Sequence, residues 1–147
     1  MRLKDFVDVN EEDWPDDEYI TEVKQMKRFM DQELYDLIMG SEYPFLHGIM
    51  FSGFQFENPL ESSRGLPCFF IDFGDPITDS YLMFSGIIEI LIKGKLQIDN
   101  SPFMDEIQSA YYSIDGGTSE FIMRLSDGIT IYIRSLGISL LRQTKKV

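Results

Sequence analysis

The pattern of apolar residues divides the chain into a helical first part and a strand-forming second part. From residue 19 the apolar positions recur every three or four residues, which is the spacing of one face of an α-helix. These positions are Tyr19, Ile20, Val23, Met26, Met30, Leu34, Leu37 and Ile38. The pattern predicts an amphipathic helix over 15–40, with Pro15 in its first turn, Gly40 as its stop signal and Asp31 as a point where it can break in two.

From residue 45 onward the apolar residues alternate with polar ones or form short runs, as they do in strands. The predicted strands are 47–56, 68–73, 81–92, 95–98, 107–114, 119–125, 129–135 and 137–141. Glycine-containing turns separate many of them, at 93–95, 115–117 and 126–128, and loops are predicted over 57–67 and 74–80. Links this short require antiparallel pairing, because parallel pairing needs a crossover of roughly a dozen residues.

We therefore predict an α+β fold, in which an N-terminal amphipathic helix, whole or broken in two, precedes a strongly bent, mostly antiparallel sheet of about 7–8 strands. A chain of 147 residues has the length of a single domain. Within residues 1–147 we expect an acidic N-terminal arm over 1–14, a helical segment over 15–40, the sheet over 45–142 and a basic tail over 143–147.

The strand patterns also predict which side chains are buried. In 129–135 the isoleucines alternate with Thr130, Tyr132 and Arg134, which predicts a sheet with one solvated face, whereas 81–92 is apolar on both faces and is expected to be central. Tyr111 and Tyr112, like Tyr132, are expected at the surface. The first three strands are rich in phenylalanine, which is typical of a core and could also line a cup for an apolar ligand. These are Phe51, Phe54, Phe56, Phe69, Phe70, Phe73 and Phe84.

A short internal similarity joins residues 49–53, IMFSG, and 82–86, LMFSG. A duplicated ligand-binding strand would give such a match. The similarity ends after these residues, and no longer repeat recurs along the chain. We therefore attribute both Ser-Gly pairs to a bulge or bend in a strand, where glycine relieves close packing.

The net charge of the chain is −12 at pH 7 and is unevenly distributed. Residues 1–22 carry nine acids against Arg2 and Lys4, residues 23–123 carry fifteen acids against six bases, and residues 124–147 carry five bases against Asp127. Affinity for nucleic acid and for anionic lipid comes largely from lysine and arginine. We therefore expect neither a nucleic acid nor a membrane as partner, and a basic protein fits best. The oligomeric state is not predicted.

Acidic residues are densest in 8–22, DVNEEDWPDDEYITE, which holds eight carboxylates, no basic residue and the only tryptophan. A cap and one or two carboxylates are ordinary at a helix start, because they interact favourably with the helix dipole. The acidic run exceeds that need, and tryptophan and tyrosine are frequent hot spots of binding. The sequence therefore predicts a partner-binding segment formed by Glu11, Glu12, Asp13, Trp14, Asp16, Asp17, Glu18 and Tyr19.

No motif of a hydrolase nucleophile or of a phosphate-binding loop is present, and we predict no catalytic residue. The only histidine, His47, and the only cysteine, Cys68, could form a nucleophile–base pair across neighbouring strands, but a partly buried thiol in an aromatic strand and a histidine at a strand entrance are the favoured interpretation. The acids that could ligate a hard cation do not follow the spacing of a calcium loop, so we predict neither a metal nor a cofactor. These acids are Glu57, Asp72, Asp75 and Asp79.

Two function hypotheses remain, beside an acidic surface that serves solubility alone. The first is an acidic binding protein, in its concrete form a bacterial immunity protein or antitoxin that occludes a basic, nuclease-like toxin. The alternative is a small apolar-ligand-binding domain or enzyme that uses the aromatic strands with Glu57, Asp72 or His47. The longest apolar run is too short for a transmembrane helix, and Asp5 and Asp8 interrupt the place of a signal peptide, so we expect the cytoplasm.

Overall fold

Six antiparallel strands organise the described part of the chain from residue 50 onward. The computed structural model describes residues 3–9, 24–40, 50–58, 65–73, 78–94, 105–125 and 128–144. The strands are β1 (Met50–Glu57), β2 (Cys68–Phe73), β3 (Thr78–Lys93), β4 (Asp105–Asp115), β5 (Thr118–Leu125) and β6 (Thr130–Thr144). The 3-10 helices η1 (Leu3–Phe6) and η4 (Lys27–Phe29) and the α-helix α2 (Gln32–Gly40) precede them. The predicted α+β class with a mostly antiparallel sheet is therefore confirmed.

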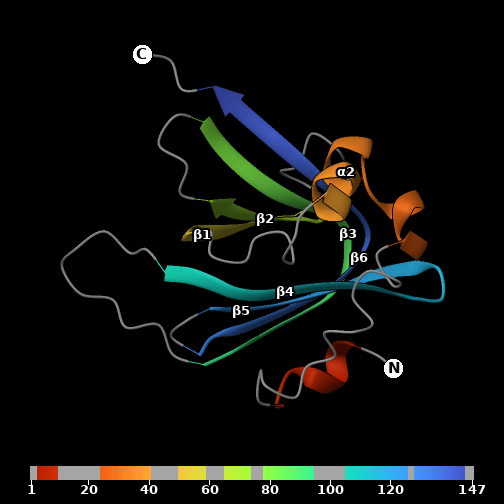
Figure 1. Ribbon diagram of the computed structural model, residues 1–147. Coiled ribbons are helices and arrows are strands. Elements are labelled where there is room, and N and C mark those ends of the chain that lie inside the picture. The colour runs from red at the N-terminus through yellow and green to blue at the C-terminus, as the bar shows by residue number, and fades with distance from the viewer. Residues whose placement is uncertain are drawn as a thin grey trace.

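The strands close into a barrel in the order β1-β2-β3-β6-β5-β4. The closing pair, β1 with β4, is short and joins Met50 to Glu106 and Phe51 to Asp105. Figure 1 shows two layers, in which β1 and β2 lie above β4 and β5, and the long strands β3 and β6 run from one layer into the other.

The predicted count of about 7–8 strands is not confirmed, since the described residues form six. The predicted strands 129–135 and 137–141 are one strand, β6, because Gly137 stays paired with Ser85 of β3. The predicted strand 95–98 lies outside the described residues. The loop predicted over 74–80 is too long, because Thr78, Asp79 and Ser80 already pair with β6.

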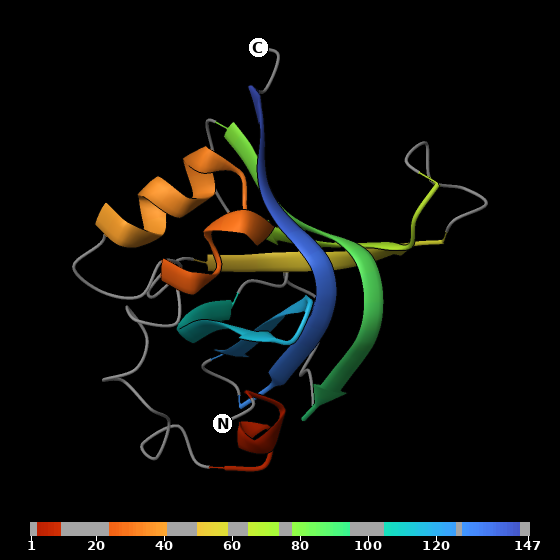
Figure 2. The same ribbon diagram turned by 90° about the vertical axis from the view of Figure 1, so that its right-hand side faces the viewer.

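The bend of β3 and β6 is built on a glycine. After Ser85 pairs with Gly137, the register of the two strands shifts between Ile87 and Glu89, and both strands turn into the second layer (Figure 2). Gly86 has a φ of +67°, and a Cβ at this position would lie 2.7 Å from Leu136 Cδ1. A glycine is therefore required here both by backbone conformation and by space.

Both Ser-Gly pairs of the internal similarity lie at strand irregularities, as we predicted. The pairing of β1 with β2 shifts register between Phe51 and Gly53, and the second pair leads into the bend of β3. The turn predicted at 115–117 is also confirmed, because Asp115 pairs with Thr118 and Gly116 has a φ of +64°.

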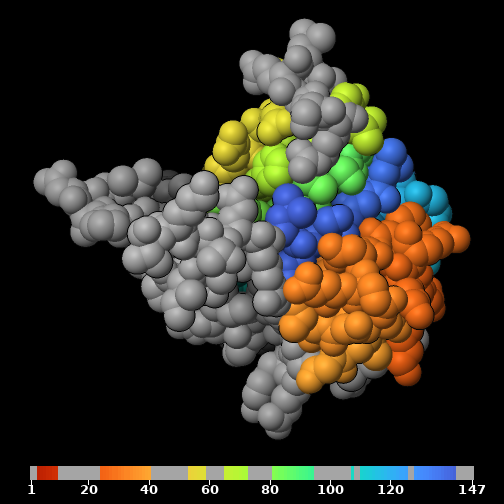
Figure 3. Space-filling model, turned by 90° about the horizontal axis from the view of Figure 1, so that it is seen from above, coloured from red at the N-terminus to blue at the C-terminus, as the bar shows by residue number. Residues whose placement is uncertain are grey.

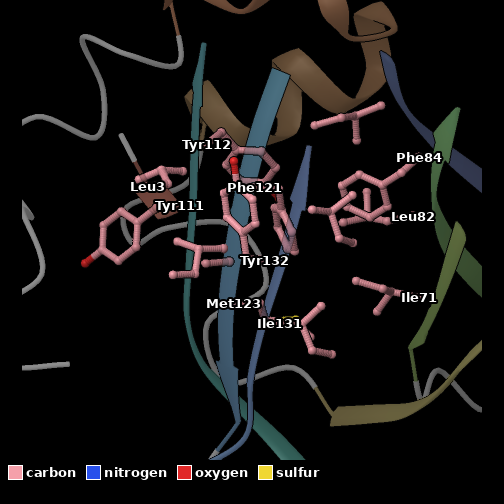
Figure 4. Close-up of a cluster of buried hydrophobic side chains, with 14 of the residues drawn as sticks. Leu3, Ile71, Leu82, Phe84, Tyr111, Tyr112, Phe121, Met123, Ile131 and Tyr132 are labelled. Atoms are coloured by element: carbon pink, nitrogen blue, oxygen red, sulfur yellow. The ribbon is translucent and has the colours of Figure 1, made fainter. Parts of the chain in front are cut away.

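The core lies between the layers and is largely aromatic at its centre. The ring of Phe121 lies 4.9 Å from that of Phe84 and 5.1 Å from that of Tyr112, measured between centroids. Figure 4 shows these side chains converging from β3, β4 and β5. Ile71 and Leu82 extend the same cluster and have no exposed surface. Part of the phenylalanine-rich sequence is therefore ordinary core.

The solvated face predicted for 129–135 is wrong at Thr130 and Tyr132, which are buried, whereas Arg134 is partly exposed, and η1 lies over the same layer of the sheet. Leu3, Phe6 and Val7 are buried and belong to the same apolar cluster as the strands. The amide of Lys4 donates to Oε2 of Glu120 in β5 (3.4 Å), and Figure 1 shows η1 beneath the layer of β4 and β5. Tyr132 consequently has no exposed surface.

The other two tyrosines expected at the surface are also buried. Tyr111 is 5% exposed and Tyr112 is 1% exposed. The ring of Tyr112 lies in the core against Phe121. The expectation that these tyrosines lie at the surface is therefore wrong.

The long N-terminal helix is not confirmed. Residues 10–23 lie outside the described residues, and α2 begins only at Gln32. Asp31 begins it, since its carboxylate accepts hydrogen bonds from the amides of Leu34 (3.0 Å) and of Leu140 in β6 (3.2 Å). Met30 has an extended backbone and pairs with Ile138, and this interrupts the helical segment between η4 and α2. None of the helices in the described ranges is long and apolar enough to span a bilayer.

Candidate functional site

The partner-binding segment predicted from the sequence lies outside the described residues and stays a prediction. Its members, Glu11, Glu12, Asp13, Trp14, Asp16, Asp17, Glu18 and Tyr19, all fall within 10–23. The residues that lead into it are fixed to the barrel. Lys93 Nζ lies 2.7 Å from Asp8 Oδ1, and Arg124 Nη2 donates to the carbonyl of Val9 (2.9 Å). Asp8 and Val9 therefore lie beside the ends of β3 and β5.

The residues considered for chemistry are not brought together in the described part of the chain. Cys68 is buried, and its thiol donates to the carbonyl of Leu66 (3.4 Å). His47 and Asp75 lie outside the described residues. Among the residues that the structure describes, no group of three or more histidine, cysteine, aspartate or glutamate side chains could hold a metal ion.

Glu57 and Asp72, the polar groups proposed for an aromatic cup, lie on the opposite face of the β1–β2 hairpin from Phe54, Phe56 and Phe69, and Phe70 is the ring that shares their face. Glu57 pairs with Cys68 and Gly53 pairs with Asp72, whereas Phe54 pairs with Ile71. Because side chains of neighbouring residues in a strand point to opposite faces, the carboxylates and the core-facing rings cannot line one cup.

Several basic side chains are paired with acids of the same chain. Lys4 Nζ lies 2.6 Å from Glu89 Oε1, and Arg134 Nη2 lies 3.5 Å from Asp115 Oδ2. The pair of Lys93 with Asp8 adds a third contact of this kind. These pairs join the N-terminal segment to β3 and the end of β4 to β6, so they serve the fold.

Other basic side chains contact carbonyls and rings of the chain. Arg124 Nε donates to Thr130 Oγ1 (3.0 Å) in addition to its bond with Val9. Arg28 donates to the carbonyl of Gly116 (3.4 Å) and lies 4.7 Å from the ring centroid of Phe29. The positive charges of these residues therefore lie against the protein itself, while the chain as a whole has an excess of carboxylates.

Among the acidic residues that the structure describes, Glu120 is fully buried. The hydroxyl of Tyr132 donates to its Oε2 (3.0 Å), as does the amide of Lys4. Sequence analysis did not single out Glu120, because its burial depends on η1, which comes from the far end of the chain. These contacts fasten η1 to the sheet, so we assign Glu120 a structural role.

Two phenyl rings are exposed on the face of β1 that elsewhere faces the core. Phe54 is 41% exposed and Phe56 is 52% exposed, although their pairing partners Ile71 and Phe69 are buried. The cause is the strand topology. β1 pairs with β4 only through Met50 and Phe51, so Phe54 and Phe56 lie beyond the point where the barrel closes. Sequence analysis assigned both rings to the aromatic strands without distinguishing them. The long predicted loop after them was the only signal of a projecting hairpin.

We compared the chain with known protein families, with curated protein sequences and with solved structures, and none of them matches. Functional inference therefore depends on the charge and geometry of the chain itself. The two features that stand out are the acidic excess and the exposed rings of the β1–β2 hairpin.

Proposed function

We propose that this chain is a non-catalytic binding protein that captures a basic protein partner. Its concrete form would be an immunity protein or antitoxin that occludes a nuclease-like toxin in the bacterial cytoplasm. The observation that carries the proposal is the net charge of −12, in a molecule in which Lys4, Arg28, Lys93, Arg124 and Arg134, among the described basic residues, contact acids, carbonyls or rings of the same chain. Such a surface attracts a basic partner over distances beyond direct contact.

The proposed mechanism has two steps. Carboxylates of the acidic segment first steer the basic partner towards the protein and raise the rate of association. They then pair with lysines and arginines that the toxin uses on its own anionic substrate, so that the substrate is excluded. Trp14 and Tyr19 would serve as the desolvated anchors that slow dissociation.

The alternative is a small apolar-ligand-binding domain or enzyme, and fewer observations support it. Its proposed polar groups, Glu57 and Asp72, lie on the other face of the hairpin from Phe54. The thiol of Cys68 is buried and bonded to a carbonyl. Of the polar groups proposed for this ligand-binding or enzymatic site, His47 is the one that remains.

The test begins with the gene next to the one that encodes this chain. We expect it to encode a strongly basic protein, whose purified nuclease domain binds this chain and loses activity when bound. Variants His47→Ala and Cys68→Ala should inhibit as well as the wild type, provided that thermal unfolding shows them to be folded. A metabolic enzyme as neighbour, or a folded variant that no longer inhibits, would instead support the enzymatic alternative.

A further inference from the structure

The second half of β3 is an edge strand of the layer that contains β4 and β5. β3 pairs with β2 only as far as Ser85, and the amide of Ile87 then donates to the carbonyl of Pro67 (3.1 Å). Residues 88–93, which we call the open edge, pair with β6 and with no other strand that the structure describes. Figure 2 shows this part of β3 along one side of the molecule, with β6 on its inner side.

The other end of the same strand pair shows how this chain closes an edge. The last half of β6 has β3 on one side, and the segment 24–40 lies against it, as Figure 3 shows. Met30 pairs there with Ile138, and the carboxylate of Asp31 accepts a hydrogen bond from the amide of Leu140. Edge amides and carbonyls that lack such cover are a template for pairing with another chain. Within the described ranges the open edge of β3 has no comparable cover.

The open edge has the composition of a strand that pairs. Its sequence is IEILIK, and two of its isoleucines are exposed. Unpaired charges protect many edge strands from pairing. Here Glu89 is already paired with Lys4, and Lys93 is already paired with Asp8. The two charges of the open edge are therefore compensated within the chain and do not prevent a further strand from docking.

The open edge is complementary to itself when two copies run antiparallel. With a two-fold axis at Leu91, Glu89 of each copy lies opposite Lys93 of the other, and Ile90 lies opposite Ile92. Glu89 and Lys93 share one face of β3, because both contact the segment of η1. Opposite charges on facing strands attract each other, so this register gains two such pairs. An axis at Ile90 would instead place Glu89 opposite Leu91.

We infer that the occupant of the open edge is a second copy of this chain, and that residues 88–93 of the two copies pair in this antiparallel register. The layer of β4, β5, β6 and β3 then continues from one copy into the other. Lys4 and Glu89 of one copy, followed by Lys93 and Asp8 of the other, alternate in sign across the axis. This alternation offsets locally the repulsion between two molecules of net charge −12. The inference is independent of the proposed function.

Sedimentation velocity tests the dimer, in salt of about 0.15 M, where charges are screened beyond about 8 Å. We expect monomers at about 1 µM and mainly dimers at about 500 µM, because one strand pair is a small interface of modest affinity. Ile92→Lys places a charge on the open edge and should weaken the dimer by about tenfold or more. Leu66→Lys is the matched control and should leave the dimer unchanged, because Leu66 is 43% exposed and Ile92 is 45% exposed.

Charge reversal tests the register. Glu89→Lys and Lys93→Glu, each made alone, place like charges opposite each other and should weaken the dimer by about tenfold. The two reversals combined restore opposite charges across the axis, so the dimer should recover. Contacts within one chain cannot cause this recovery, because the double variant leaves Lys4 beside a lysine and Asp8 beside a glutamate.

Cysteine crosslinking locates the axis. The background is Cys68→Ala, which removes the only cysteine. Leu91→Cys should form an intermolecular disulfide under mild oxidation, because Cα atoms directly opposite each other lie about 4.5–5.5 Å apart, within the range of a disulfide. Ile88→Cys is the control and should not crosslink, because its two copies lie at opposite ends of the paired strands.

Three results would overturn the inference. The first is a protein that stays monomeric at the highest concentration, and the second is Leu91→Cys that crosslinks no better than Ile88→Cys. The third is a dimer that Leu66→Lys dissociates and Ile92→Lys leaves intact, which would assign the contact to the β1–β2 hairpin. Thermal unfolding should confirm that every variant is folded, and if a charge-reversal variant is not, the two cysteine variants decide the register.

Discussion

At the scale of single residues, the buried carboxylate of Glu120 is the group that most needs hydrogen-bond donors from elsewhere in the chain. Its Oε2 accepts from the hydroxyl of Tyr132 and from the amide of Lys4, so residues from three parts of the chain meet at one oxygen. A buried charge is tolerated only where such donors surround it. The alternation of 129–135 correctly separated Tyr132 from the isoleucines, but a local pattern cannot show that a distant segment covers its face.

We expect Tyr132→Phe to lower the free energy of unfolding by about 1–3 kcal/mol, because it removes a donor from a buried carboxylate. Urea denaturation measures the change. In a Glu120→Gln background the same substitution should cost less, since a neutral amide is easier to leave partly unsatisfied. Tyr35→Phe is the matched control, because Tyr35 is half-buried and its ring, rather than its hydroxyl, contacts Lys27. Equal losses in both backgrounds would contradict this role of Glu120.

At the scale of elements, the turns could be predicted and the course of the long strands could not. The turn at 115–117 depends on local glycine chemistry, which the sequence displays directly. The continuity of β6 depends instead on the pairing of Gly137 with Ser85. Tertiary pairing overrides local propensity there, and propensity alone cannot anticipate it.

Three glycine-to-alanine substitutions separate the two reasons why position 86 requires glycine, its backbone conformation and its lack of space. A Cβ at Gly117 would have no atom within 4 Å, and φ there is not in the left-handed region. A Cβ at Gly116 would also have no atom within 4 Å, but φ is +64°. At Gly86 φ is +67° and a Cβ would clash with Leu136. We expect losses of unfolding free energy of about 0, about 1 and more than about 2 kcal/mol, because a left-handed conformation and a steric clash add to each other. Urea denaturation gives the order. A Leu136→Ala substitution should recover part of the loss in Gly86→Ala, and no recovery would count against the clash.

The segment of η1 gives a second prediction at this scale. Phe6→Ala should lower the free energy of unfolding by about 3 kcal/mol, because it removes a buried ring that covers the sheet. Asp8→Asn, in the same segment, removes only an exposed ion pair with Lys93 and should change it by less than about 1 kcal/mol. Thermal or urea unfolding of the two variants measures the contrast. Similar effects of both would mean that ion pairs, rather than burial, fasten η1.

At the scale of the whole molecule, the sequence predicts the α+β class and the acidic excess, because both depend on composition and pattern. It does not predict which rings stay exposed. Phe54 and Phe56 have the same residue type and the same alternation as the buried Phe69, and only the early separation of β1 from β4 distinguishes them. The predicted acidic segment lies outside the described residues, so its role depends on binding measurements.

Trp14→Ala provides the first of these measurements. We expect it to speed dissociation of the basic partner while the association rate changes little, because the loss of a hot-spot anchor acts mainly on dissociation. Surface plasmon resonance separates the two rates. An unchanged dissociation rate would remove Trp14 from the binding site.

The most direct test of the central claim, that acidic residues steer a basic partner, is the association rate measured by stopped flow as salt is raised. The variant has Glu11, Glu12, Asp16 and Asp17 replaced by glutamine or asparagine. Its melting temperature should equal or exceed that of the wild type, since mutual repulsion is removed. In low salt it should associate more slowly than the wild type, and the difference should shrink as salt rises, because charges are screened over about 10 Å at 0.1 M. Equal association rates of variant and wild type in low salt would contradict the account.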